Sequence, residues 1–270
     1  MNTFKDKNTI VTGGASGIGR ALCINLAKMG ARVIVADINE QGAQEVVQAI
    51  VASGGQAKAF KVDVSVKDEI QFLINKAGRL DYMFNNAGFA FTGELRDTTD
   101  ELLQKIIKIN LWGVIYGSTA AYEIMRKQGS GHIINTASMA GLVPIPMQAG
   151  YVTTKHAIVG FTKTMRAEAE AFGIKVSVIC PSLIDTPIVR NSPVLNCTIE
   201  ELEPKIPIKK YPVEKMVQAI IKGVQRNQAV IIAPYYARLL LKFYQLFPGL
   251  MEKTLGRKVV RDFRSIRHEP

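Results

Sequence analysis

Tyr151 and Lys155, four residues apart, are the side chains of this sequence best suited to proton transfer. Residues at this spacing lie on one face of a helix, which would bring the ammonium near the phenol. A phenol with a pKa of about 10 is poorly matched to neutral pH, and a nearby ammonium would lower that pKa by stabilising the phenolate. Ser138, which ends a strand-like run, would hydrogen-bond a carbonyl or alcohol oxygen. These residue types indicate general acid/base chemistry at an oxygen atom.

A glycine-rich segment, residues 12–19, lies near the N-terminus. Its glycines at positions 13, 17 and 19 would permit a tight turn and close approach of the backbone to a pyrophosphate. An expected strand precedes the segment and an expected helix follows it, which is the context that a dinucleotide-binding loop requires. The amides and the dipole at the start of that helix favour phosphate. The sequence therefore predicts a nucleotide-binding loop.

Asp37 ends the second expected strand, about 20 residues beyond the glycine segment, where a carboxylate can accept hydrogen bonds from the adenosine ribose. A negative charge at this place repels a 2′-phosphate. Ile38 and Asn39 carry no cation that would bind such a phosphate, and Ser16 occupies the loop position where a basic residue would serve it. The sequence therefore favours NAD(H) over NADP(H) as the cofactor.

Strand and helix patterns alternate along the chain as far as about residue 234. The expected strands cover residues 8–12, 32–36, 57–62, 80–85, 131–137, 175–180 and 229–233, and the expected helices 21–29, 40–53, 66–77, 100–127, 150–172 and 213–227. This predicts an α/β fold, a single doubly wound Rossmann-type parallel sheet with helices on both faces. Proline and turn residues make residues 182–212 an expected irregular, mobile lid.

The composition bounds the class of protein. A chain of 270 residues with 47% hydrophobic and 21% charged residues can bury a substantial core. We expect no metal site, because the three cysteines lack CxxC spacing and the three histidines are scattered. The cysteines suit a reducing compartment, and no secretory signal or run of about 18 apolar residues is present. These features predict a cytoplasmic protein.

Further motifs complete a pattern with those already described. Residues 85–88 read Asn-Asn-Ala-Gly after the fourth expected strand, and Asn110 is a polar residue in an apolar stretch of a long expected helix. With the glycine segment, Asp63-Val64, Ser138, Tyr151 and Lys155, the chain over residues 7–234 resembles the short-chain dehydrogenase/reductase family in its common single-domain form. The family usually has Pro-Gly where this chain has Pro181-Ser182, and residues 66–77 are about one turn shorter than usual.

The resemblance implies a dinucleotide-binding and catalytic domain over residues 1–234, with Asn110, Ser138, Tyr151 and Lys155 as a catalytic tetrad. Tyr151 would exchange a proton with the substrate oxygen while hydride moves between its carbon and the nicotinamide. Lys155 would also hold the nicotinamide ribose, and Asn110 would anchor a water that relays protons. The implied cofactor contacts are Gly13, Ser16, Gly17, Ile18, Gly19, Asp37, Asp63, Val64, Asn86, Ala87, Gly88, Tyr151, Lys155, Ile184 and Thr186. Family members pair their two long helices, so the resemblance also implies a homodimer or homotetramer.

The segments expected to surround the substrate are apolar. Residues 89–93, 139–148 and the lid would lie over the nicotinamide and favour a hydrophobic alcohol or ketone, such as a steroid, retinoid or fatty-chain compound. The expected lining comprises Phe89, Met139, Leu142, Met147, Leu183 and Ile188.

The last 36 residues form an expected apolar and basic helical extension, residues 235–270, which holds eight basic and three acidic residues. Residues 235–247 are strongly apolar, and Pro248-Gly249 interrupts them. Four interpretations stay open: a solvated basic tail that aids solubility, a peripheral contact with a membrane surface, packing over the substrate cleft, and packing against another subunit.

The leading hypothesis is an NAD-dependent oxidoreductase for a lipophilic secondary alcohol or its ketone. A second hypothesis is a reductase for a small polar or acyl-carrier-bound carbonyl, which the net charge of +11 would help to attract. A third, of another class, is a non-catalytic redox sensor that only binds the nucleotide. Nucleic-acid binding is disfavoured, because the basic residues interleave with leucines and no nucleic-acid motif accompanies them.

Overall fold

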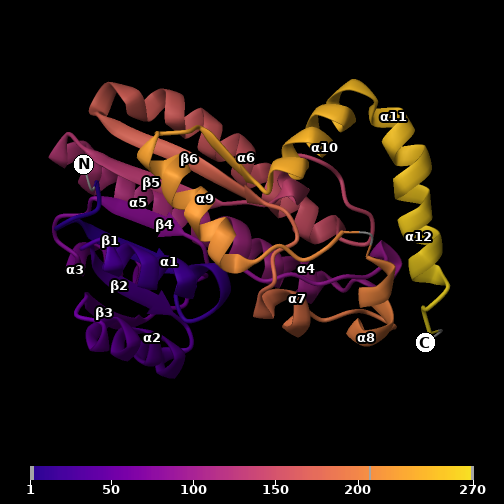
Figure 1. Ribbon diagram of the computed structural model, residues 1–270, viewed down its shortest axis with the longest axis horizontal. Coiled ribbons are helices and arrows are strands. Elements are labelled where there is room, and N and C mark those ends of the chain that lie inside the picture. Colours follow the sequence, from indigo (N-terminus) through magenta and orange to yellow (C-terminus); the bar gives the residue numbers. More distant parts are fainter. Residues whose placement is uncertain (1–2, 207, 269–270) are drawn as a thin grey trace.

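The computed structural model describes residues 3–206 and 208–268 (Figure 1). Its strands form one parallel sheet in the order β3-β2-β1-β4-β5-β6-β7. The chain builds outward from β1 to β3, then crosses back and builds outward from β4 to β7, so the expected doubly wound Rossmann-type sheet is confirmed. Residue 207 of the expected lid and residues 269 and 270 of the expected extension lie outside the described residues. The strands are β1 (Asn8–Thr12), β2 (Arg32–Asp37), β3 (Gln56–Lys61), β4 (Tyr82–Asn85), β5 (Gly131–Thr136), β6 (Ile174–Pro181) and β7 (Val230–Ala233).

Helices cover both faces of the sheet, and each face has its own apolar core. Consecutive strand residues point to opposite faces, so Val11 of β1 packs with one set of helices and Ile10 with the other. The first set comprises α1 (Gly17–Lys28), α2 (Glu40–Ala52) and α9 (Val213–Gln225). The second comprises α3 (Lys67–Lys76), α5 (Gly113–Gln128) and α6 (Ala149–Ala169). Helix α4 (Asp100–Ile106) packs against α6.

Two element boundaries differ from the expectation for identifiable reasons. Strand β4 begins at Tyr82 instead of residue 80, because the backbone of Leu80 is hydrogen-bonded to a side chain instead of a strand. The amide of Leu80 donates to Oε1 of Gln128 at 2.9 Å, and Nε2 of Gln128 donates to the carbonyl of Leu80 at 2.8 Å. Helix α1 begins at Gly17 instead of residue 21, so two glycines of the loop form its first turn. The nucleotide-binding segment and the helix start are therefore one structure.

The region expected to be an irregular lid contains short helical pieces. They are α7 (Pro187–Asn191), α8 (Ile199–Leu202) and a 3₁₀ turn, Glu203–Lys205. A capping box starts α8, in which Thr198 and Glu201 satisfy each other's backbone amides.

The C-terminal extension is helical, as expected. It comprises α10 (Tyr235–Leu246), α11 (Pro248–Met251), a π-helical turn (Glu252–Gly256) and α12 (Arg257–Arg264). Figure 1 shows the extension, in yellow, leaving the sheet at α10 and returning in α12 to end beside α8. None of the helices in the described part of the chain combines the length and apolar character needed to span a bilayer.

Candidate active site

The glycine loop and the turn after β4 are joined by one buried hydroxyl. Thr12, the last residue of β1, accepts hydrogen bonds at its Oγ1 from the amides of Asn86 and Ala87, at 3.0 and 3.1 Å. The Asn86 side chain donates in return to the carbonyl of Thr12, at 3.2 Å. The structure therefore brings together the carboxyl ends of β1 and β4, the adjacent strands at which the sheet order reverses.

The glycine loop has the backbone that its sequence predicts. Gly13 has a φ of +64°, and a Cβ atom there would lie 2.8 Å from the Cα of Ala87. Gly17 has a φ of +51° and lies against Thr186, whose Cβ would be 3.3 Å from an added Cβ. The side chain of Ser16, the N-cap of α1, makes no capping hydrogen bond, and Gly19 is buried in the first turn. The start of α1 thus presents amides that Ser16 does not cap, beside the first residues of the lid.

Asp37 organises the same loop through its carboxylate. Its Oδ2 accepts a hydrogen bond from the amide of Ala15, and its Oδ1 accepts one from the amide of Asn39, each at 2.9 Å. A carboxylate oxygen has a second lone pair, so each oxygen can still accept a further donor. Asp37 therefore lies at the rim of the loop in a fixed orientation.

Asp63 and Val64 are more engaged with the protein itself than the sequence suggests. Asp63 Oδ1 accepts from both the amide and the hydroxyl of Ser65, at 2.9 and 2.7 Å. The Val64 side chain is buried and packs against Gly113 of α5. Ile18, by contrast, only partly buries its side chain, against the core of the α1 face.

Tyr151, Lys155 and Ser138 are brought together at the carboxyl ends of β5 and β6. Lys155 Nζ lies 5.4 Å from the ring centroid of Tyr151, and the Ser138 hydroxyl is hydrogen-bonded to Tyr151. Ser138 Oγ also accepts from the amide of Ala140, at 3.1 Å. Lys155 is 4% exposed, so its ammonium lies inside the protein.

The ionisation of these groups differs in one respect from the expectation. Burial raises the pKa of Tyr151, and the hydrogen bond with Ser138 opposes that rise only in part. Burial also lowers the pKa of Lys155 to about 8, with the neighbouring Cys180 opposing the change. The expected net lowering of the Tyr151 pKa is therefore wrong for this structure, because the loss of water outweighs the hydrogen bond with Ser138.

Asn110 is fully buried and lies in a π-helical turn, Ile107–Trp112, between α4 and α5. Its side chain accepts from the amide of Phe89 and donates to the carbonyl of Phe89, both at 2.9 Å. It also lies 3.5 Å from the hydroxyl of Thr154, one residue from Lys155. The long helix expected over residues 100–127 is thus locally widened at Asn110, which ties it to the loop after β4.

Three segments border the region beside Tyr151: the β4 loop (residues 86–99), the β5 loop (residues 137–148) and the lid (residues 182–212). The amide of Gly93 donates to the carbonyl of Met147, at 2.8 Å. Thr92 donates to Pro193 at 3.0 Å and accepts from Leu195 at 2.8 Å. Backbone hydrogen bonds therefore join the β4 loop to both other segments.

The expected substrate-lining residues have different surroundings. Met139 is buried, and Phe89 has Lys105 Nζ 5.4 Å above its ring. Leu142 packs against the core of α6 and β6, whereas Ile188 is 38% exposed on α7. Leu183 lines a hollow of about 250 Å³ with five residues of the lid, Glu203, Ile206, Ile208, Lys209 and Lys210.

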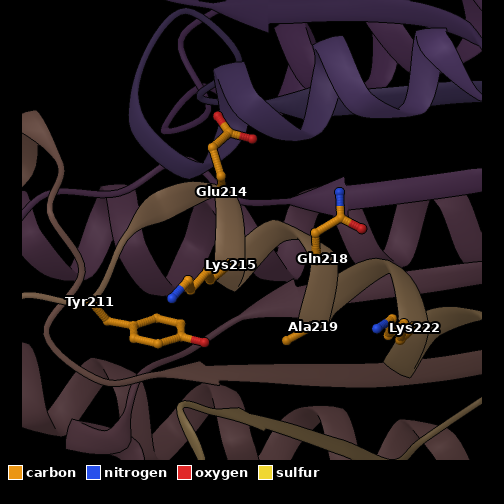
Figure 2. A pocket seen from close by; sticks show the side chains of 6 residues that line it. All are labelled: Tyr211, Glu214, Lys215, Gln218, Ala219 and Lys222. Carbon is orange, nitrogen blue, oxygen red and sulfur yellow. The ribbon is translucent and has the colours of Figure 1, made fainter.

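A larger hollow, of about 410 Å³, lies along α9 (Figure 2). It is open and is lined by Tyr211, Glu214, Lys215, Gln218, Ala219 and Lys222. None of the expected site residues contributes to it. Nor do any three His, Cys, Asp or Glu side chains within residues 3–206 and 208–268 form a group that would hold a metal ion.

The sequence reading missed four residues that support the site. Thr12 joins β1 to β4, the Thr136 carbonyl accepts from Lys155 at 3.0 Å, and Thr154 lies between Tyr151 and Asn110. Cys180 is fully buried beside Lys155, and burial raises its pKa to about 12. The sequence feature that could have identified two of them is a hydroxyl residue at the end of an expected strand, as at Thr12 and Thr136.

Comparisons with known proteins agree with this geometry. The family model described as short chain dehydrogenase matches residues 7–194. Levodione reductase from Leifsonia aquatica is 35% identical over 76% of this chain and 78% of its own length. Cyclohexanol dehydrogenase from an Acinetobacter species is 35% identical over 80% and 84% of the two chains. A crystal structure of a short chain dehydrogenase/reductase from Burkholderia phymatum in complex with NAD superimposes with a TM-score of 0.84 at 25% identity, covering 93% of this chain and 97% of that one.

Proposed function

We propose that this chain, which belongs to the short-chain dehydrogenase family, interconverts a lipophilic secondary alcohol and its ketone with NAD(H). The observation that carries the proposal is the assembly of Ser138, Tyr151 and Lys155 beside a glycine loop that can receive a dinucleotide. Two of the relatives are named for a reductase of levodione and a dehydrogenase of cyclohexanol, which supports an alcohol or a ketone as substrate.

The residues present fit a dinucleotide. Gly13 and Gly17 have backbone conformations that other residues rarely adopt, and the start of α1 offers amides to a pyrophosphate. Gly13, Gly17, Gly19, Ser16 and Ile18 would hold the phosphates. Asp37, Asp63, Val64, Asn86, Ala87 and Gly88 would lie along the adenosine half, and Ile184 and Thr186 along the nicotinamide. The bound cofactor would supply the hydride acceptor or donor.

The chain's own residues would handle the proton. Tyr151 Oη exchanges it with the substrate oxygen, and Ser138 Oγ holds that oxygen in place by a hydrogen bond. Lys155 lies beneath the Tyr151 ring, where its ammonium favours release of the phenolic proton as the reaction proceeds. Asn110 joins the β4 loop to α6 through its bonds to Phe89 and Thr154.

NAD(H) is the proposed cofactor because two backbone amides hold the carboxylate of Asp37 at the rim of the loop. Both of its oxygens are aligned by backbone amides, which leaves them able to accept ribose hydroxyls and to repel a 2′-phosphate. Ile38, the next residue, is 63% exposed and carries no charge. The related Burkholderia protein was crystallised with NAD, which supports the same choice.

The proposed substrate is hydrophobic because the segments beside Tyr151 are largely apolar. Met139 and Phe91 are buried there, and Phe89 and Met147 are partly buried in the same loops. Such walls would exclude water from a ketone carbon and stabilise an apolar body by contact.

A homodimer or homotetramer is the proposed assembly. On α5 and the π-helical turn before it, Trp112 is 44% exposed and stacks on Tyr116 with ring centroids 5.5 Å apart. An exposed aromatic pair on a long helix is suited to contact a second copy. Sedimentation equilibrium of the whole chain would give the mass of two or four chains.

A peripheral contact of the extension with an anionic membrane surface is also proposed. Leu239, Phe243 and Leu246 are 51%, 43% and 73% exposed on one face of α10. Arg238 and Lys242 flank this face, so an apolar stripe is bordered by cations, as in helices that lie in a membrane interface.

The experiment that tests the proposed reaction follows NADH formation by absorbance with a panel of steroid, retinoid, fatty-chain and cyclic secondary alcohols. We expect turnover of a lipophilic member with NAD⁺ and much weaker turnover with NADP⁺. Turnover with NADP⁺ alone would contradict the cofactor assignment. NADH binding without turnover of any alcohol would instead favour the redox-sensor hypothesis.

A further inference from the structure

The end of the C-terminal extension, residues 257–268, is called the strap here. Its Arg267 donates to both oxygens of Asp97 in the β4 loop, from Nη2 at 2.8 Å and from Nε at 3.2 Å. Both side chains are only 9% exposed. Two parallel hydrogen bonds between a guanidinium and a carboxylate define their relative orientation more tightly than one bond does. The strap is therefore seated on the β4 loop in a specific position.

A second ion pair lies beside the first. Arg264 donates from its Nε to Oε1 of Glu94, and Glu94 is 6% exposed. The hydrogen bond from Arg264 holds the pKa of Glu94 below its usual value, and the one from Arg267 does the same for Asp97. Both carboxylates are therefore ionised partners of the strap at neutral pH.

The strap also contacts the lid. The amide of His268 donates to the carbonyl of Asn196 at 2.7 Å, and His268 Nε2 lies 3.0 Å from Oε1 of Glu201. Asn196 in turn hydrogen-bonds through its side chain to Asp97. Figure 1 shows α12 running down to the region of α8, where the strap ends.

The strap differs from a solvated basic tail because two of its side chains are buried. Phe263 is 1% exposed and Arg267 is largely buried, whereas Lys258 and Arg261, also in the strap, are exposed. A tail that served solubility alone would not remove an arginine from water, because a buried charge is unfavourable unless it is paired. The pairing of Arg267 with Asp97 therefore indicates a specific contact between the strap and the β4 loop.

We propose that Arg267 is a positioning residue that clips the strap across the β4 loop and the lid and so keeps the substrate site closed around a bound alcohol or ketone. The proposal rests on the proposed function. Opening of the site requires the β4 loop and the lid to separate, and the strap bonds to both of them. Without the clip, substrate and product would escape faster, which raises the KM for the alcohol. The strap contacts described above are to the β4 loop and the lid and not to the cofactor loops at the ends of β1 and β2, so the KM for NAD⁺ would be unchanged.

The kinetic test uses 2-octanol with NAD⁺. We expect Arg267→Ala to raise the KM for 2-octanol about tenfold, which corresponds to about 1.4 kcal/mol, with kcat and the KM for NAD⁺ changed by less than about twofold. Arg267→Lys should fall between, since an ammonium cannot make the paired bonds of a guanidinium. Lys258→Ala removes an exposed cation from the strap and is the matched control, with no change expected.

A double-mutant cycle tests the pairing itself. If Arg267 acts through Asp97, adding Asp97→Ala to Arg267→Ala should raise the KM by less than about twofold further. If the KM changes of the two single variants instead multiply in the double variant, Arg267 does not act through Asp97. An unchanged KM in Arg267→Ala, or an equal change in Lys258→Ala, would overturn the proposal.

Hydrogen exchange of the cofactor-free protein tests the clip without any turnover. Residues 91–98 and 196–206 should exchange faster in Arg267→Ala than in the wild type, and at the wild-type rate in Lys258→Ala. Equal exchange in all three proteins would refute the clip. If the wild type oxidises no alcohol, the proposed function fails, but this measurement still decides whether the strap holds the lid.

Discussion

The ammonium of Lys155 donates a hydrogen bond to the backbone carbonyl of Thr136, at 3.0 Å. Thr136 is the last residue of β5, and Lys155 lies on the second turn of α6. The bond fixes the lysine at the carboxyl edge of the sheet, under the ring of Tyr151. Because Lys155 and Thr136 are both buried, the charge of Lys155 acts with little screening by water.

Tyr151→Phe should remove the group that exchanges the proton and leave the fold intact. We expect kcat to fall by at least about 100-fold, as for loss of a general acid or base, while NADH still binds. Steady-state kinetics would measure kcat, and a fluorescence titration would measure NADH binding. Tyr235→Phe, at a tyrosine that is 71% exposed, serves as the control. Retained turnover in Tyr151→Phe would show that Tyr151 is not the general acid/base.

Lys155→Met tests the environment of the lysine through the pH dependence of stability. Burial lowers the Lys155 pKa from 10.5 to about 8, so between these values the unfolded chain holds a proton that the folded chain has released. The free energy of unfolding of the wild type therefore rises with pH in this window, by about 2 to 3 kcal/mol. Methionine does not titrate, so the variant lacks the rise.

The difference is measured by chemical denaturation from about pH 7 to about pH 10.5. Working in a Tyr151→Phe background removes the ionisation of that phenol from both proteins. A stability difference that does not change with pH would show that Lys155 is not desolvated.

Asn110→Ala should destabilise the protein and disturb the site together. The variant leaves the amide and the carbonyl of Phe89 without their partner, which lowers the free energy of unfolding by about 1 to 3 kcal/mol. Denaturation and kcat measurements would record both effects. Gln104→Ala, on the exposed face of α4, is the control and should change neither. A stable, fully active Asn110→Ala would mean that the π-helical turn does not depend on this side chain.

Asp37→Asn combined with Ile38→Arg should shift the cofactor preference toward NADP⁺. The first change removes the charge that repels a 2′-phosphate, and the second adds a cation at a position that is 63% exposed. We expect the ratio of kcat/KM for NADP⁺ to that for NAD⁺ to rise by at least about 100-fold, or about 2.7 kcal/mol. Ile38→Ala alone should leave the ratio near its wild-type value. No shift in the double variant would mean that Asp37 does not select the cofactor.

Phe243→Glu tests the proposed membrane contact. The wild type should sediment with vesicles that contain phosphatidylglycerol, and the variant should bind them at least about tenfold more weakly. Val51→Glu, at an apolar residue of α2 that is 55% exposed, controls for the added charge. Equal sedimentation of the two variants would show that α10 is not the contact face.

Local patterns in the sequence were enough for much of the fold. Alternating apolar runs with periods of two and 3.6 residues predicted the strands and helices of the sheet, because burial on one or both faces imposes those periods. The spacing of Tyr151 and Lys155, and the glycines between a strand and a helix, predicted which residues meet at its carboxyl edge. These relationships depend on neighbours in sequence, so the sequence alone determined them.

The remaining features join residues that are far apart in the chain, and only the tertiary structure decided them. Thr12 bonds to Ala87, the pKa of Tyr151 is raised by burial, and Arg267 pairs with Asp97 across 170 residues. A basic tail has several solvated or packed alternatives of similar free energy, and its composition does not choose among them. Packing of Phe263 and pairing of Arg267 favour the packed arrangement, in which the strap lies on the β4 loop. A buried arginine is unfavourable unless its charge is paired with a carboxylate, which Asp97 provides.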